Sequence, residues 1–239
     1  LQAIRIGELT IATLPNEVYA LTGLKLRARS PATMHFNIEL ANGAEGYIPP
    51  PEQHTLGGYT TWPARTAGLE VQAESKIVEA LSSALEEVTG QPIRTMQDEH
   101  GPYALAVLAG KPLAYWRMND AEGSTPRNAV EAGPVAHLTG AFAFYLPGVG
   151  SGSGIGSGER LTAAAFSRDP VINRAIHFAG GSMTAEISQP SDHYTLAAWI
   201  WLGEPSGASQ RSGLIVRGPF GEKLIAHQDA EHRVRLELV

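Results

Sequence analysis

Hydrophobic and polar residues alternate most regularly between Thr33 and Leu40. Every second residue of this segment is apolar, and the residues between them are polar or charged. A period of two is typical of a β-strand that turns one face toward the protein interior, so the pattern predicts a half-buried strand. The apolar face comprises Met34, Phe36, Ile38 and Leu40, and the polar face comprises Thr33, His35, Asn37 and Glu39.

A hairpin is predicted before this strand and a long helix after it. Two short apolar runs, 4–6 and 9–14, flank a Gly-Glu turn and indicate the hairpin. Apolar residues at helical spacing run through 68–89 and predict an amphipathic helix. Gly90 and Pro92 follow it and mark where this helix ends.

A shorter helix is predicted over 17–28, with Asn16 as its N-cap. Lys25, Arg27 and Arg29 gather at its C-terminal end. Cations at this position complement the negative end of the helix dipole. We expect this basic helix end to be solvated.

Beyond residue 111 the helical signals nearly vanish and short strand candidates recur. Turn residues separate them, a pattern that is typical of an all-β sandwich or barrel. The candidates are 113–118, 175–178, 183–187, 194–202, 214–217, 223–227 and 233–239. Both alternating faces of 194–202 are apolar, which predicts a central strand.

The predicted fold class is an α/β (α+β) N-terminal segment followed by an all-β sandwich. A polar, turn-rich stretch at 91–102 is expected to link an N-terminal part, 1–90, to the sandwich, 103–239. The chain begins at Leu1 and ends on an unfinished strand pattern. We therefore expect a truncated sandwich and a fragment of a longer protein.

Composition and charge exclude several classes of protein. The chain carries 18 Lys and Arg against 24 Asp and Glu, for a net charge of −6, and it has no basic run. Nucleic-acid binding requires clustered cations, so this partner is not expected. The absence of cysteine excludes disulfides, thiolate metal sites and a cysteine nucleophile. No apolar run approaches the ~20 residues that cross a bilayer.

Short catalytic motifs are absent from the sequence. The eight histidines are scattered and form no His-Glu-x-x-His, and no Gly-x-Ser-x-Gly occurs. A Gly/Ser-rich stretch at 147–158 lacks the spacing of a phosphate-binding loop, and its composition favours a flexible surface loop. Residue spacing alone thus indicates only the fold class.

The first 90 residues resemble the last part of the catalytic domain of neutral ceramidases, and more closely the bacterial proteins called neutral/alkaline non-lysosomal ceramidase-like. The resemblance rests on a strand, a Pro-x-Glu helix start, a second strand, and then Asn-Gly, Gly-Tyr-x-Pro and Gly-Gly-Tyr in this order between Ile4 and Tyr59. Members of that family are zinc amidohydrolases that cleave the N-acyl bond of ceramide. The resemblance thus implies a zinc enzyme that acts on a lipid amide.

The same resemblance implies a role for three residues. Glu17 and Tyr47 match the family's glutamate and tyrosine zinc ligands, and Tyr59 matches a second tyrosine that holds the scissile carbonyl. The family's two histidine ligands and its catalytic serine belong to sequence upstream of this chain. The residue before the glutamate is usually Gly in the family and is Asn16 here.

Structural roles are the alternatives for these residues. Glu17 in the first turn of a helix complements the helix dipole, for about 0.3–1 kcal/mol. Tyr47 and Tyr59 are predicted in loops, and the alternative for both is that their rings simply cover part of a hydrophobic core. His54, beside the same loop, is a candidate for the rim of the cleft.

The second half resembles concanavalin A-like, laminin-G-type jelly-roll modules, on the segments 103–118, 175–187 and 194–202. Some of these modules bind calcium and glycans at a loop rim. The acidic loop residues that suit such a calcium site are Asp120, Glu122 and Asp192. Because Trp116, Trp199 and Trp201 lie inside apolar segments, we expect them in the core.

Two hypotheses for function follow from these resemblances. The first is a fragment of a secreted or periplasmic bacterial amidohydrolase of ceramidase type, with a lectin-like accessory module. The second is a non-catalytic extracytoplasmic carbohydrate-binding or adhesion protein whose ceramidase-like part is a degenerate scaffold. Two histidines at metal spacing and a nearby serine in the upstream sequence would favour the enzyme.

Overall fold

The computed structural model describes residues 1–95, 100–148, 173–187, 194–200, 211–217, 223–228 and 234–238. The chain forms two compact units, Leu1–Gln189 and Pro190–Val239. Helices and strands are mixed, and the described strands form small sheets of two or three strands, none closed into a barrel. The mixed composition is as predicted. A single sandwich over 103–239 stays a prediction, because the described strands there belong to separate sheets.

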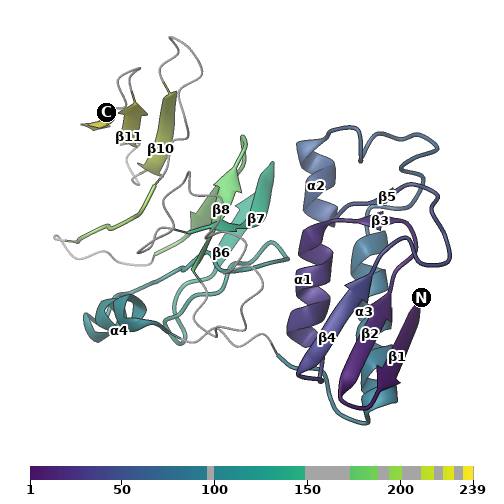
Figure 1. Ribbon diagram of the computed structural model, residues 1–239. Helices are drawn as coiled ribbons and strands as arrows, with labels where there is room; N and C mark the ends of the chain where they lie inside the picture. The colour runs from purple at the N-terminus through teal and green to yellow at the C-terminus, as the bar shows by residue number, and fades with distance from the viewer. Residues whose placement is uncertain are drawn as a thin grey trace. The chain divides into compact units, whose positions relative to one another are not determined.

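The first unit opens with a three-stranded sheet in the order β1-β2-β4 (Figure 1). Strands β1 (Gln2–Ile6) and β2 (Leu9–Thr13) form the predicted antiparallel hairpin. Strand β4 (Met34–Ile38) pairs in parallel with β2 after the crossover helix α1 (Ala20–Arg29). The N-terminal part therefore contains one β-α-β unit.

Helices α1 and α3 (Ala73–Thr89) cover the inner face of this sheet. Their core contains apolar side chains from both helices and from β2 and the residue after it: Ala12, Leu14, Leu26, Val78 and Leu81. Helix α3 ends at Gly90, whose φ of 68° lies in the left-handed region that glycine adopts easily. The end of the long helix is thus as predicted, and its start lies five residues later.

No described element covers the outer face of the sheet, and here the prediction from alternation is wrong. Met34, Phe36 and Ile38 are 43–57% exposed, whereas His35 on the opposite side is 9% exposed. The inner face accepts polar side chains because they bond to one another: His35 Nδ1 lies 2.9 Å from Thr10 Oγ1. The outer face carries seven apolar side chains, namely Ile4, Ile6, Leu9, Ile11, Met34, Phe36 and Ile38.

The start of α1 also differs from the prediction. Residues Glu17–Val18 form strand β3, which pairs in parallel with β5 (Tyr47–Ile48). The helix therefore begins at Ala20, with Tyr19 rather than Asn16 at the N-cap position. A short helix, α2 (Pro51–Leu56), follows β5.

The expectation that the basic end of α1 is solvated is wrong for Lys25. Lys25 is only 3% exposed, and its Nζ lies 3.0 Å from Glu74 Oε1 of α3. Thr22 donates a second hydrogen bond to the same oxygen, at 3.0 Å. A partner 49 residues away in the sequence thus holds this cation inside the protein.

The rest of the first unit contains helix α4 (Pro102–Ala109) and two antiparallel strand pairs. Strand β6 (Ala136–Thr139) pairs with β9 (Ser182–Ala185), and β7 (Phe142–Pro147) pairs with β8 (Arg174–Phe178). The predicted strands at 175–178 and 183–187 correspond to β8 and β9. The predicted strand at 113–118 is reduced to a single bridge between Trp116 and Asn128.

A second core lies between these strands and α1. Its buried members are Leu138, Phe142, Phe144 and Ile176, and Leu21 of α1 packs against them. Within the first unit, the helical layer is thus in contact with the strands that follow it.

The second unit contains an antiparallel sheet in the order β10-β11-β12. Its strands are β10 (Arg211–Arg217), β11 (Lys223–Gln228) and β12 (Val234–Leu238), as the sequence predicts. The predicted central strand at 194–202 is wrong over its described part, because 194–200 pairs with no described strand. Trp199 is 70% exposed rather than in the core, and Trp201 lies outside the described residues.

Among the helices of the described segments, none combines the length and the apolar character that crossing a bilayer requires.

Candidate functional site

The three predicted site residues come from one corner of the first unit, where β3 and β5 pair. Glu17 and Tyr47 are directly opposite each other in the parallel register. The next residues, Val18 and Ile48, turn inward: Val18 packs against the first core and Ile48 is 1% exposed. Because side chains alternate along a strand, Glu17 and Tyr47 project together to the other side.

Two backbone turns bring these strands side by side. Asn16 has a φ of 60°, and its side-chain Oδ1 accepts a hydrogen bond of 2.9 Å from the N–H of Glu45. Gly46 has a φ of 126°, and a Cβ there would lie 2.3 Å from the carbonyl oxygen of Thr66. Gly46 thus has to be glycine, whereas Asn16 occupies the left-handed region that glycine and asparagine both adopt. An asparagine before the glutamate therefore preserves the turn that a glycine would make.

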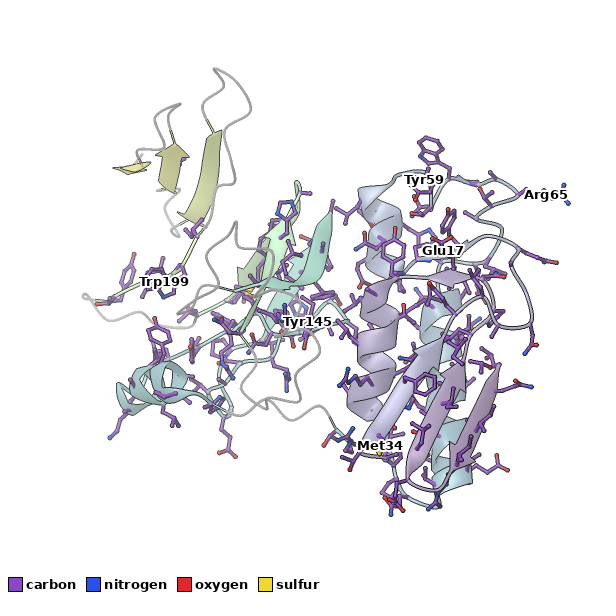
Figure 2. All side chains as sticks on the ribbon, in the orientation of Figure 1. Glu17, Met34, Tyr59, Arg65, Tyr145 and Trp199 are labelled. Atoms are coloured by element: carbon purple, nitrogen blue, oxygen red, sulfur yellow. The ribbon has the colours of Figure 1, made fainter. Side chains whose placement is uncertain are left out.

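Tyr59 joins this pair from the loop after α2. Its ring meets the ring of Tyr47 edge-on, with 5.3 Å between the centroids and an interplanar angle of 85°. A hydrogen bond between the Tyr47 and Tyr59 hydroxyls, which favours the protonated form of Tyr47, and the negative charge of Glu17 raise the pKa of Tyr47 above its usual value. Figure 2 shows Glu17 and Tyr59 at the same end of the first unit. The structure thus brings the three predicted residues together.

The loop that carries Tyr59 is tied down on both sides of this residue. The Tyr19 hydroxyl lies 2.6 Å from Thr60 Oγ1, and Thr60 is 9% exposed. Further along, the N–H of Tyr47 donates to the carbonyl of Thr66 at 2.8 Å. These contacts fix the loop against α1 and β5 and therefore hold Tyr59 over Tyr47.

The donor set suits a metal ion, although it is incomplete. A carboxylate and a phenol emerge side by side from paired strands, and both are oxygen donors that zinc accepts when the phenol is deprotonated. Within the described residues, no group of three or more His, Cys, Asp and Glu side chains is placed to hold a metal. Glu17 and Tyr47 would supply at most two ligands, and a closed zinc site requires more.

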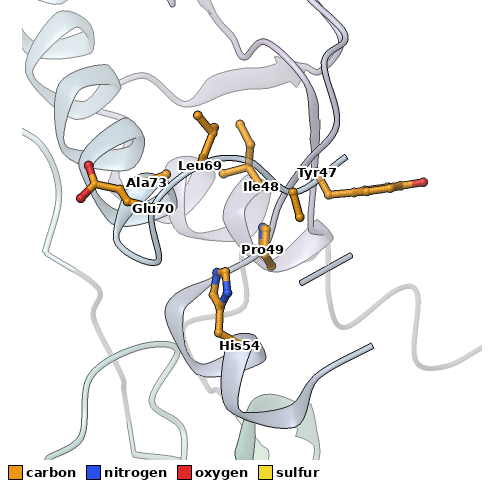
Figure 3. A pocket seen from close by; sticks show the side chains of 8 residues that line it. Tyr47, Ile48, Pro49, His54, Leu69, Glu70 and Ala73 are labelled. Atoms are coloured by element: carbon orange, nitrogen blue, oxygen red, sulfur yellow. The ribbon is translucent and has the colours of Figure 1, made fainter. Parts of the chain in front are cut away.

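A narrow crevice lies beside the pair, and His54 faces it (Figure 3). The Nε2 atom of His54 is buried and has no hydrogen-bond partner among the described residues. Desolvation lowers the pKa of His54, so its neutral form is favoured. The ring of Tyr47 points away from His54 in Figure 3, so the histidine lies outside the cluster of Glu17 and the two tyrosines.

Two of the three acidic residues suggested for calcium, Asp120 and Glu122, are paired with cationic side chains. Asp120 is 8% exposed and accepts hydrogen bonds from the backbone N–H of Arg127, at 3.2 Å, and from its Nε, at 3.4 Å. Glu122 pairs with Arg29 and lies 3.8 Å from Lys25. Asp192 lies outside the described residues. The calcium site stays a prediction.

Trp62 is a residue at this corner that sequence reasoning missed. It follows Tyr59 by three positions and is 62% exposed, as is Tyr59 itself. No periodicity or motif singles it out, because its exposure depends on how the loop is fixed to α1 and β5.

Comparison of the chain with protein-family models, with curated proteins and with solved structures finds no match.

Proposed function

We propose that this chain is part of a zinc-dependent amidohydrolase of the neutral ceramidase type, which hydrolyses the N-acyl amide bond of a sphingolipid-like substrate. The observation that carries the proposal is the grouping of Glu17, Tyr47 and Tyr59 at the β3–β5 pair. These residues were selected from sequence resemblance alone, and they are 30 and 12 positions apart. Their proximity supports a shared role. The parent protein is proposed to be secreted, periplasmic or on the surface of a bacterium.

Glu17 and Tyr47 are the proposed metal ligands. Glu17 is exposed and offers a carboxylate, and Tyr47 offers a phenol whose proton a bound cation displaces. Bound zinc supplies a Lewis acid and lowers the pKa of a bound water. The remaining ligands, two histidines in the family that the chain resembles, are proposed to come from sequence upstream of this chain.

Tyr59 is the proposed contact to the scissile amide. It is 62% exposed and therefore accessible to a substrate, while its ring rests on Tyr47. A neutral hydroxyl in this position donates a hydrogen bond to the oxygen that becomes negative when the amide carbonyl is attacked. One such donor is worth about 2.7–4 kcal/mol in well-studied enzymes.

The strands of 103–239 are proposed as an accessory module of lectin type that binds glycans. An alternative function for the whole chain is a non-catalytic carbohydrate-binding or adhesion protein with a degenerate ceramidase-like scaffold. Upstream sequence that lacks two histidines at metal spacing and a nearby serine would favour this alternative.

Zinc content and N-acyl hydrolysis, measured on the full-length protein that carries this sequence, test the proposal. Glu17→Ala is expected to lower both. Tyr59→Phe is expected to keep the zinc and to lower kcat by about 10²–10³-fold, as expected for a lost oxyanion donor. Glu8→Ala, at an exposed turn of the β1–β2 hairpin, is the matched control and should change neither. A Glu17→Ala protein that keeps its zinc and its activity would contradict the proposal, and wild-type protein without zinc or hydrolysis would favour the scaffold.

A further inference from the structure

The loop from Gly57 to Val71 presents apolar side chains to solvent next to the candidate site. Tyr59 and Trp62 are each 62% exposed, and Leu69 and Val71 are 49% and 46% exposed. Single exposed apolar residues are ordinary on a protein surface, whereas several on one segment indicate a binding surface. We call this segment the aromatic loop.

Trp62 is exposed because hydrogen bonds hold the loop in place on both sides of it, at Thr60 and at Thr66. Thr60 is held by the Tyr19 hydroxyl at 2.6 Å, and the carbonyl of Thr66 is held by the N–H of Tyr47 at 2.8 Å. A further turn closes inside the loop, where the N–H of Thr61 donates to the carbonyl of Gly58 at 3.0 Å. Because the loop is already ordered, a ligand that buries Trp62 loses little conformational entropy of the chain on binding.

The residue types of the aromatic loop match a lipid–water interface. Tyrosine and tryptophan have an apolar ring with a polar edge and are enriched at the level of lipid headgroups. Arg65 lies between the anchored ends and projects outward in Figure 2. Its guanidinium can stay in the headgroup region while the rings enter the acyl boundary.

The charge of the chain indicates which kind of lipid surface would fit. The net charge is −6, and the aromatic loop carries a single Arg and no Lys. Anionic membranes attract clusters of Lys and Arg and repel an acidic protein. A neutral, zwitterionic surface, to which rings bind by apolar burial, is therefore favoured.

We propose that the aromatic loop docks on a zwitterionic lipid surface, with Trp62 as its main anchor. The candidate site then takes its amide from lipid in that surface rather than from solution. This second statement rests on the proposed function, whereas the docking itself does not.

Binding to vesicles of pure phosphatidylcholine tests the docking. The full-length protein is mixed with the vesicles, and the bound fraction is measured by flotation over a range of lipid concentrations. Trp62→Ala is expected to lower the partition coefficient about tenfold or more, since burying one large apolar side chain is worth about 1.5–3 kcal/mol. Trp62→Phe keeps a ring and is expected to retain most of the binding. Trp199→Ala, at a 70% exposed tryptophan of the second unit, is the control and should bind like wild type.

The outcomes separate the docking from the chemistry. Glu17→Ala removes a proposed zinc ligand outside the aromatic loop and is expected to bind the vesicles like wild type. Loss of hydrolysis without loss of vesicle binding therefore leaves the docking intact. Wild-type protein that does not float with phosphatidylcholine, or Trp62→Ala protein that floats as well as wild type, would overturn it. Binding that appears only after phosphatidylserine is added would overturn the zwitterionic mode.

Discussion

The two faces of the β1-β2-β4 sheet differ in a way that their polarity does not suggest. The inner face, under α1 and α3, includes Thr10 at 0% and His35 at 9% exposure. The outer face carries seven apolar side chains, and no element of the described residues covers it. Apolar character therefore does not decide which face is buried here. The inner face is buried because two helices cover it and because its polar groups find hydrogen-bond partners, which removes the penalty of burying them.

The aromatic loop is a second exposed apolar surface of the first unit. The outer face is made of Ile, Leu, Met and Phe in register across three strands, as in a sheet that a further layer covers. The aromatic loop instead carries tyrosine, tryptophan and arginine on a short anchored segment. The residue types indicate a packing face for the outer face of the sheet, whereas the aromatic loop is the surface proposed to bind lipid.

The largest expected effect comes from breaking the buried ion pair behind the inner face. Lys25→Met leaves the carboxylate of Glu74, which is 1% exposed, without its cation. Removing one partner of a buried pair typically costs about 3–5 kcal/mol. We expect a loss of this order in the free energy of unfolding, measured by urea denaturation.

Two controls belong to this experiment. Lys76→Met breaks the ion pair with Glu70 on the surface, where the side chains are 64% and 60% exposed, and should cost about 0–1 kcal/mol. The double variant Lys25→Met/Glu74→Leu replaces the buried pair by apolar groups and should recover most of the loss. Equal effects of Lys25→Met and Lys76→Met would show that the inner pair is hydrated.

The next effect compares similar truncations on the covered and uncovered sides. Leu81→Ala removes a side chain of 0% exposure from the core of α3 and should cost about 2–5 kcal/mol. Met34→Ala on the outer face, where Met34 is 57% exposed, should cost less than about 1 kcal/mol. Thermal unfolding of both variants measures the difference. A similar cost for both would mean that the outer face is covered in solution.

A smaller effect depends on pH and concerns Glu52 of α2. Burial raises its pKa above the usual value, and Glu74 and Glu122 add to the effect while Lys25 opposes it. Since the folded state then binds the proton more tightly than the unfolded state, this group contributes less stability as pH rises through the window above its usual pKa. The Glu52→Gln variant, which stays neutral, should match wild type near pH 4 and become relatively more stable toward pH 7. Melting temperatures of both proteins across this range check the sign, and a difference that narrows as pH rises would contradict it.

Local patterns predicted the elements that depend on neighbouring residues. The β1–β2 hairpin, the end of α3 at Gly90 and the three strands of the second unit follow from turn residues and short apolar runs. The buried face of β4 did not follow, because helices from elsewhere in the chain decide it. Lys25 was missed for the same reason, since Glu74 is remote in sequence.

The residues of the candidate site were predicted from a resemblance to a family and not from local hydrophobic patterns. A resemblance to ceramidase-like proteins in the order of short motifs predicts Glu17, Tyr47 and Tyr59 as site residues, and their spacing alone implies no contact. The helix start predicted at Glu17 is a strand instead, because its pairing with β5 overrides a weak helical signal. Trp62 had no sequence signal, since only the anchored loop makes it prominent.

The central claim is that Glu17 and Tyr47 share one metal ion, and anomalous diffraction at the zinc edge tests it most directly. Crystals of the full-length protein, grown with zinc, are expected to show a peak about 2.0–2.2 Å from a carboxylate oxygen of Glu17 and at similar distance from the phenol oxygen of Tyr47. A zinc peak bound elsewhere, or no zinc peak while both side chains are ordered at the β3–β5 pair, would contradict the claim.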